Sequence, residues 1–407
     1  MKTHPDLLAT AGEIADLAQA LSQESIIAFD TEFIRESTFY PMVEIIQIAT
    51  AKESWLVDAA AFKRKHKPGP QGSYDPAIKP LLDVFENRSI LKILHAAQGD
   101  QECLYTSFGV IASPTLDTAV AASLCGYGDG IGLGKLLKAI MDVTLPKGHA
   151  RTNWSVRPLP QQLLEYAHDD VKYLVEAGER LLEQLSRKGR REWALELSAK
   201  WEDQSLYESD AEGMVRKIAR SGRLDKREYA ALFELVRWRE NRVRQLNLPR
   251  RWIADDAVLV DLARVRPKDL AHLSAFRGLN KGELKNSGAE ILNALKQASE
   301  EEGKILPPAS ERHEIPTIEE SQVIDLLKCY VGILADRHKI AAKHLISSSQ
   351  LLSFVRSHVE SPQDLVEAGI LEKDAAHLIG EEIIAFVRGK RALSVSGTKI
   401  QIVKVEE

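Results

Sequence analysis

The chain has 407 residues, of which 44% are hydrophobic and 28% charged, and its formal net charge at pH 7 is −5. This length predicts two or three domains. Three widely spaced cysteines exclude a disulfide framework and a Cys-x-x-Cys metal site, and no apolar run reaches the roughly 18 residues of a membrane span. The start, MKTHPDLLAT, lacks the apolar core of a signal peptide, so we expect a cytoplasmic protein.

Short apolar, β-branched runs dominate the first hundred residues. Four of them predict strands: SIIAFDTEF (25–33), MVEIIQIAT (42–50), ESWLVDAA (53–60) and SILKILHA (89–96). Short connections join the first three runs, which indicates an antiparallel meander, and a helical pattern near 77–87 precedes the fourth. Helices then take over and end in one long helix over 160–185. We therefore expect a mixed α/β domain over residues 1–190.

The rest of the chain has helical patterning almost throughout. We expect a helical connector over 191–223, a helical domain over 224–300, an acidic linker with two prolines over 301–317 and a second helical domain over 318–407. Segments of the second domain echo the first, which indicates a weak, divergent internal duplication. The tail SGTKIQIVKVEE has the alternation of a strand but no evident partner.

Carboxylates stand out in this pattern. Asp30 and Glu32 share one face of the first predicted strand, where burying two like charges is costly unless water or a cation compensates. Asp100 follows the fourth strand, in a position where it could simply cap a helix. Tyr166 and Asp170 are i, i+4 neighbours on the long helix, but Asp169 competes at i+3, so spacing leaves the choice of aspartate open.

Four carboxylates meeting at one strand edge would form a hard, oxygen-only site of the kind that binds Mg²⁺ or Mn²⁺. The sequence offers no cluster of histidine and cysteine for zinc. Two such divalent cations can bind the attacking and the departing oxygen of a phosphodiester. Each piece alone has an ordinary structural interpretation: a strand end open to water for Asp30 and Glu32, a helix cap for Asp100 and a solvated acidic helix edge for the last. The hypothesis therefore depends on the pieces meeting in the fold.

Three segments resemble the exonuclease motifs of the DEDD superfamily, in its Tyr-x-x-x-Asp subtype. The three segments, FDTEF, LHAAQGDQECL and EYAHDDVKYL, occur in the order of the family's motifs. The segment NWSVRPL, which precedes the last motif, resembles the corresponding segment of the ribonuclease D family. LVRWRENRVRQLNLPRRWIADD resembles the helicase-and-RNase-D C-terminal domain, with a weaker second copy at 318–391. The resemblance implies an RNase H-like fold, metal ligation by Asp30, Glu32, Asp100 and Asp170, and a catalytic Tyr166 that orients the attacking water.

The resemblance also implies an activity. We expect a 3′–5′ exoribonuclease that uses two Mg²⁺ or Mn²⁺ ions, releases nucleoside 5′-monophosphates and trims structured RNAs with single-stranded 3′ ends, such as tRNA precursors. It would act as a monomer, with no organic cofactor and no membrane. The alternatives are a DNA 3′–5′ exonuclease and a non-catalytic RNA-binding protein with a nuclease fold; the complete set of four carboxylates and a tyrosine argues against the second.

Basic residues suggest where RNA binds. Residues 213–252 hold 12 Lys or Arg against 4 Asp or Glu. The candidate contacts are Thr31 and His95 near the carboxylates, Lys147, Arg151 and Arg157 before the catalytic helix, and Arg237, Arg239, Arg250 and Arg251 in the first helical domain. A structural hydrogen bond is the alternative for His95, a solvated basic loop for the group before the helix, and ion pairs for the arginines. Trp238 is expected to pack in a core.

Overall fold

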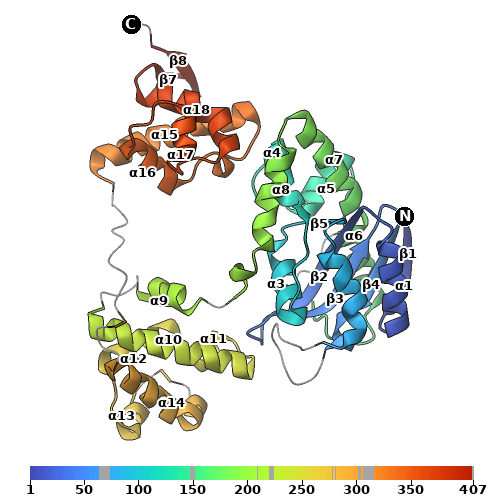
Figure 1. The fold of residues 1–407 in the computed structure, drawn as a ribbon, viewed down its shortest axis with the longest axis vertical. Helices are drawn as coiled ribbons and strands as arrows, with labels where there is room; N and C mark the ends of the chain where they lie inside the picture. The colour runs from blue at the N-terminus through green and yellow to red at the C-terminus, as the bar shows by residue number, and fades with distance from the viewer. Residues whose placement is uncertain are drawn as a thin grey trace.

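The computed structural model describes residues 1–63, 74–146, 152–208, 210–219, 224–276, 278–279, 281–300, 304–305 and 316–405. Three regions follow one another along the chain: an α/β unit in blue to green, a helical unit in yellow and gold, and a second helical unit in orange and red (Figure 1). None of the described helices is long and apolar enough to cross a membrane. The expected α/β domain followed by helical regions is confirmed.

One sheet of six strands forms the centre of the α/β unit, in the order β1-β4-β3-β2-β5-β6. The pairs β2–β3 and β3–β4 are antiparallel, and the other three are parallel. The strands are β1 (Lys2–Leu8), β2 (Ile26–Ile34), β3 (Met42–Ala49), β4 (Glu53–Asp58), β5 (Leu91–Leu94) and β6 (Thr115–Asp117). The predicted meander is confirmed. The sequence patterns missed β1, which contains a proline, and β6, which has only three residues.

Helices cover both faces of the sheet. Ile27 and Phe29 of β2 pack in one apolar cluster with α1, α2 and α3, whereas Ala28 faces the opposite cluster with α4 and α7. The helical elements of this unit are α1 (Ala11–Leu21), η1 (Ala59–Phe62), η2 (Pro76–Ile78), α2 (Lys79–Glu86), α3 (Gln98–Phe108), α4 (Thr118–Cys125), α5 (Leu133–Met141), α6 (Gln161–Lys172) and α7 (Leu174–Arg187). Alternation along β2 therefore gives each face its own apolar core.

The long helix predicted over 160–185 is wrong in one respect, because it is divided into α6 and α7. Tyr173, with φ −107° and ψ −4°, separates the two. α6 lies against β3 and β4, whereas α7 packs on α4 and β5. A straight helix could not follow both surfaces, so the break lets each half bury its own apolar stripe.

The segment expected as a connector begins as part of the α/β unit. It contains α8 (Arg191–Ala199), η3 (Lys200–Glu202), η4 (Gln204–Leu206) and α9 (Ala211–Ala219). The Ser198 hydroxyl accepts a hydrogen bond from the Asp117 N–H, and the Glu202 carboxylate accepts two from Thr115. α8 and η3 thus cover the β6 end of the sheet.

The first helical unit begins at a capping box, in which Asp225 and Glu228 each bond the other's backbone N–H. Its helices are α10 (Lys226–Leu246), α11 (Arg250–Ile253), α12 (Asp256–Val265), α13 (Leu270–Ser274) and α14 (Lys281–Glu300). Their apolar residues form one separate core cluster. Trp238 is buried in that cluster, as predicted.

The second helical unit repeats this order of long and short helices. It consists of α15 (Ile318–His338), η5 (Ala342–His344), α16 (Ser348–Arg356), α17 (Pro362–Glu367) and α18 (Lys373–Val387). The tail differs from the expected all-helical domain, because β7 (Arg391–Ser396) and β8 (Lys399–Lys404) pair as an antiparallel hairpin. The strand alternation in the tail thus finds its partner in the residues just before it. Most of the predicted linker over 301–317 lies outside the described residues.

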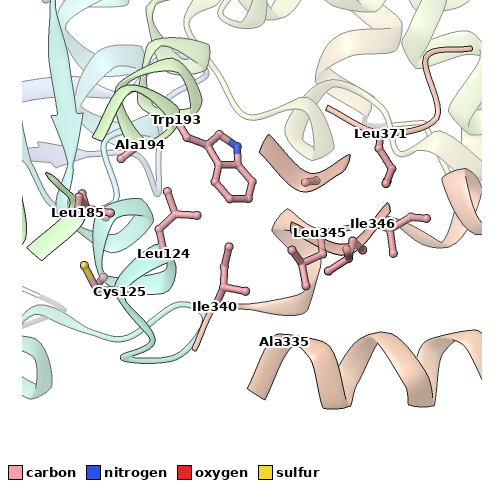
Figure 2. Packing of buried hydrophobic residues seen from close by; sticks show 14 of the residues in the cluster. Leu124, Cys125, Leu185, Trp193, Ala194, Ala335, Ile340, Leu345, Ile346 and Leu371 are labelled. Atoms are coloured by element: carbon pink, nitrogen blue, oxygen red, sulfur yellow. The ribbon is translucent and has the colours of Figure 1, made fainter. Parts of the chain in front are cut away.

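The second helical unit packs directly on the α/β unit. Leu124, Cys125 and Trp193 on one side face Ile340 and other apolar residues of the second unit on the other, within a single buried cluster (Figure 2). Polar contacts border it: the Ala341 N–H donates to the Ser123 carbonyl at 3.1 Å, and Arg190 donates to the carbonyls of Leu124 and His338. This part of the chain is therefore held by a shared core.

Candidate active site

Asp30 and Glu32 lie in the middle of the sheet, on the face of β2 that α6 covers. Asp30 is opposite Gln47 of β3, and Glu32 is opposite Ile45. A register shift between Glu32 and Phe33 interrupts the ladder just after the second carboxylate. The strand thus places two carboxylates on one face at the point where its regular pairing is disturbed.

Asp170 reaches this pair from α6. Oxygen atoms of Asp30, Glu32 and Asp170 all lie within 4.8 Å of one another. Asp169 is not part of this group, and one of its oxygens lies 3.9 Å from the Lys172 ammonium. Of the two aspartates that spacing could not separate, the fold therefore brings Asp170 to the strand carboxylates.

Asp100 completes the set from the first turn of α3. It is buried, and its Oδ1 accepts hydrogen bonds from the Thr31 N–H at 3.0 Å and the Thr31 hydroxyl at 2.6 Å. Its carboxyl group also shares a hydrogen bond with Asp30. Thr31 therefore holds Asp100 from the opposite face of β2, while Asp30 and Glu32 point toward α6.

The four carboxyl groups lie beside like charges; Asp100 is buried, and Asp30, Glu32 and Asp170 are partly buried. Burial raises the pKa of Asp30 well above its ordinary value, with further increases from Asp100, Asp170 and Glu32. Burial, followed by the charges of Asp170 and Asp100, raises the pKa of Glu32 to about 8. Burial likewise raises the pKa of Asp100 and of Asp170 to about 6. The site therefore favours the loss of negative charge, by a proton or by a bound cation.

The donor set fits divalent metal ions. All four groups offer oxygen, the ligand atom of Mg²⁺ and Mn²⁺. Across the described residues, no Lys, Arg or His forms an ion pair with any of the four. The described residues thus concentrate negative charge without a neutralising cation, and a bound metal ion would supply the positive charge.

Tyr166 lies one helical turn before Asp170, and the two side chains are hydrogen-bonded. Burial raises the pKa of the phenol far above its ordinary value, and the charges of Asp170 and Glu32 add to the increase. The phenol therefore keeps its proton at neutral pH. It can donate or accept a hydrogen bond in the site, but it is a poor general base.

Gln47 is a polar neighbour of the site that sequence reasoning missed. It is 0% exposed in β3, and neither its Nε2 nor its Oε1 has a hydrogen-bond partner among the described residues. Leaving such a group unpaired costs about 1–3 kcal/mol. The available signal was a single amide inside the apolar run MVEIIQIAT.

Three of the expected RNA contacts have partners within the protein. Thr31 is 5% exposed and its hydroxyl is bonded to Asp100. Arg157 binds both oxygens of Asp58 and donates to the carbonyls of Trp154 and Val156, so it fixes the loop before α6. Arg239 is 1% exposed and donates to Asp256 at 2.6 Å. Each of these side chains therefore has a structural role, whether or not it also contacts RNA.

The remaining candidates differ in their exposure. The His95 Nδ1 lies 2.9 Å from the Thr118 hydroxyl, and burial lowers the pKa of this imidazole. Arg237 and Arg251 have largely exposed side chains, each with a carboxylate nearby. Arg250 is half exposed and binds Glu240 through two nitrogens. Lys147 and Arg151 lie outside the described residues.

A cavity of about 310 Å³ lies where the α/β unit meets the first helical unit. Its lining includes three arginines and four aromatic residues: Arg35, Arg244, Arg250, Phe39, Tyr40, Tyr105 and Tyr207. The Asn247 side-chain oxygen accepts hydrogen bonds from the N–H groups of Phe39 and Tyr40, and Arg250 stacks 4.7 Å from the Phe39 ring. The loop after β2, the carboxylate strand, is thus tied to the helical unit.

Comparison with known proteins identifies the family of the chain and two of its domains. Residues 7–186 match the 3′–5′ exonuclease domain family and residues 229–295 match the HRDC domain. Ribonuclease D of Bartonella henselae is 32% identical over 382 residues, which span 93% of this chain and 89% of that protein. The chain belongs to the ribonuclease D family. Ribonuclease D of Zymomonas mobilis subsp. mobilis is 31% identical over the full length of both chains.

The ribonuclease D fold is also seen in the solved structures. The crystal structure of Escherichia coli RNase D, an exoribonuclease involved in structured RNA processing, superimposes with a TM-score of 0.75 at 27% identity and covers 93% of this chain and 99% of that one. The sheet and its helices are therefore an RNase H-like exonuclease unit, and the helical part includes an HRDC domain. As a member of the ribonuclease D family, the chain is a 3′–5′ exoribonuclease.

Proposed function

We propose that this exoribonuclease removes nucleotides one at a time from the 3′ ends of RNA by a two-metal-ion mechanism, with Asp30, Glu32, Asp100 and Asp170 as the metal ligands. The observation that supports the proposal is the convergence of three partly buried carboxylates, joined by a hydrogen bond to the buried Asp100, with no ion-paired cation among the described residues. When bound, Mg²⁺ or Mn²⁺ ions would stabilise negative charge on the phosphodiester oxygens and lower the pKa of the attacking water.

The residues around the ligands have complementary tasks. The charges of both Asp100 and Asp170 raise the pKa of Asp30, which supports a central role for its carboxylate among the residues that would hold the ions. Thr31 holds Asp100 through two hydrogen bonds and fixes the direction of its carboxylate. Preorganisation of this kind places the ligands before substrate arrives.

Tyr166 would position the attacking water. Its raised pKa keeps the phenol proton on Oη, so the tyrosine can hold the water in line with the terminal phosphodiester by hydrogen bonding, without removing its proton. Tyr166→Phe keeps the ring and deletes the hydroxyl. We expect kcat to fall while the Kd for RNA stays within about twofold; an equal loss of both would indicate a structural role.

The RNA substrates would be structured molecules with single-stranded 3′ ends, such as tRNA precursors and other stable RNAs. E. coli RNase D is involved in structured RNA processing, which supports this choice. The cavity between the two units offers guanidinium groups and aromatic rings, which suit phosphates and bases. Arg237 and Arg251 are proposed as further phosphate contacts on the first helical unit.

A labelled-strand assay tests the proposal. RNA and DNA of one sequence, both 5′-labelled, are incubated with Mg²⁺, with Mn²⁺ or with a chelator. We expect a ladder that shortens from the 3′ end of RNA, and that the chelator abolishes it. Asp170→Asn should remove the activity, whereas Asp169→Asn, the neighbouring carboxylate outside the cluster, should retain it. Equal activity of the two variants would contradict the ligand assignment, and faster DNA cleavage would favour a DNA exonuclease.

A further inference from the structure

Gln47 occupies a place in the sheet where an apolar residue would be expected. It lies in the middle of β3, between Asp30 on one neighbouring strand and Leu56 on the other. Residues directly opposite in an antiparallel pair share a face, so Gln47 lies on the Asp30 side of the sheet, which α6 covers. On that face of β3, the residues two places before and after it are Ile45 and Ala49.

The amide has no partner in this apolar setting. Both of its polar atoms are buried and unpaired among the described residues. A polar pair on the same face, Ser54 of β4 and His168 of α6, is already satisfied: the His168 Nδ1 lies 2.9 Å from the Ser54 hydroxyl and its Nε2 lies 3.1 Å from the His4 carbonyl. Methionine or leucine would fill this place without leaving polar atoms unpaired, so packing does not account for an amide here.

Asp30 is the one carboxylate directly across the ladder from Gln47. Side chains in such pairs have Cβ atoms about 4.5–5.5 Å apart, which is within reach of a glutamine amide. A carboxylate has about four lone-pair sites. One that binds metal ions usually accepts hydrogen bonds from neighbouring groups as well, and these bonds hold it in place.

We propose that Gln47 is a positioning residue for the metal site, whose Nε2 donates a hydrogen bond to Asp30 when the carboxylates hold divalent ions. This inference rests on the proposed metal ligation by Asp30. The amide would fix one oxygen of the Asp30 carboxylate and leave its other oxygen to the ions. Its effect on the reaction passes through Asp30, because Gln47 is enclosed by the sheet and α6 and has no exposed surface for substrate.

The test compares Gln47→Met with Leu56→Met, which changes side-chain shape on the other side of Gln47 without removing an amide. Mn²⁺ affinity is measured on the full chain by calorimetry, together with melting in EDTA. We expect Gln47→Met to weaken Mn²⁺ binding about 10–100-fold. The same variant should melt in EDTA at or above the temperature of the unmodified protein, because it no longer buries an unpaired amide. Leu56→Met should leave the affinity within about twofold.

Turnover measured at different Mn²⁺ concentrations is a second test of the inference. Gln47→Met should lower kcat at limiting Mn²⁺, leave KM for RNA unchanged and regain turnover as Mn²⁺ is raised. Gln47→Leu is the second variant should the methionine protein fold poorly. Unchanged Mn²⁺ affinity in a folded Gln47 variant would overturn the inference. If such a variant also melted at a lower temperature in EDTA than the unmodified protein, the role of Gln47 would be packing. Failure of the unmodified protein to bind Mn²⁺ would instead overturn the proposed metal site itself.

Discussion

Two sets of buried charge in this protein are built on opposite principles. Along α10, Arg239 and Glu240 are each 1% exposed, and every buried charge has an opposite partner: Arg239 binds Asp256, and Glu240 binds Arg250 and lies 3.4 Å from Arg239. Beneath α6, the four carboxylates face one another without a cation from the described part of the chain. One set is balanced by the protein, and the other is left unbalanced.

This difference separates charges that stabilise the fold from charges that are available to bind a cation. Balanced charges link α10 to α11 and α12, and their loss leaves a partner buried without compensation. Unbalanced charges oppose folding in the absence of ions, because their burial raises each carboxyl pKa. The fold retains that cost where a bound cation can remove it. Deleting one charged group should therefore have opposite effects on stability in the two places.

The largest expected effect is the loss of activity in Asp30→Asn. Removing this proposed metal ligand should lower kcat by at least about 10³-fold, since even a single electrostatic contact to the reacting oxygens contributes about 10²–10³-fold. The same change should raise the melting temperature in EDTA at pH 8, because an amide can keep a hydrogen bond to Asp100 and carries no charge. Assays of turnover and of melting in EDTA check both parts. A less stable variant would contradict the view that these charges oppose folding.

Part of the carboxylate site could be predicted from the sequence, and the parts that could not depend on tertiary packing. The i, i+2 and i, i+4 spacings placed Asp30 with Glu32 and Tyr166 with Asp170, because local geometry fixes which side chains share a face. Asp100 lies beside the strand carboxylates and Asp169 does not, and both facts depend on how α3 and α6 pack on the sheet. The burial of Arg239 was not predictable from an arginine-rich run, since α12 covers part of α10. Gln47 stands out as a candidate only once the strand pairing shows that Asp30 and Leu56 lie on either side of it.

The second effect is on the stability of the first helical unit. Arg239→Met removes the central cation of the balanced set and leaves Glu240 and Asp256 without it. We expect the free energy of unfolding to fall by about 3–5 kcal/mol, whether or not divalent ions are present. Urea denaturation followed by circular dichroism measures the change. Arg251→Met, at a side chain that is 88% exposed, is the control and should stay within about 0.5 kcal/mol. A loss below 1 kcal/mol for Arg239→Met would show that the set is not a structural link.

The third effect is the pH dependence of the metal-free protein. The Glu32 pKa is about 8 in the fold and 4.5 in its ordinary state, so between these values the folded protein holds a proton that the unfolded chain has lost. The stability contributed by this proton is complete below pH 4.5 and is lost as pH rises to 8. From pH 6.5 to 8, the free energy of unfolding in EDTA should fall by up to about 1.4 kcal/mol per pH unit from this group.

Melting in EDTA from pH 6.5 to 8, above the ordinary pKa of histidine, measures this slope, to which Asp30 also contributes because its pKa is raised too. Glu32→Gln should make the slope shallower. Mn²⁺ should reverse it, because the ions bind deprotonated carboxylates and their stabilising effect grows with pH. A slope that is equally steep in Glu32→Gln would show that Glu32 does not contribute to it.

The smallest effect concerns a guanidinium that belongs to neither set. Arg244 lines the cavity between the two units and forms no ion pair with any described carboxylate; its one hydrogen-bond acceptor there is Asn241, at 3.5 Å. A guanidinium that no carboxylate neutralises is available for a phosphate. Arg244→Gln should weaken RNA binding several-fold and reduce the slope of log Kd against log salt by about 1, with kcat unchanged. Filter binding at several salt concentrations measures both. Arg180→Gln, at an exposed arginine paired with Glu176, should change neither, and an identical salt slope in the two variants would place the phosphate path elsewhere.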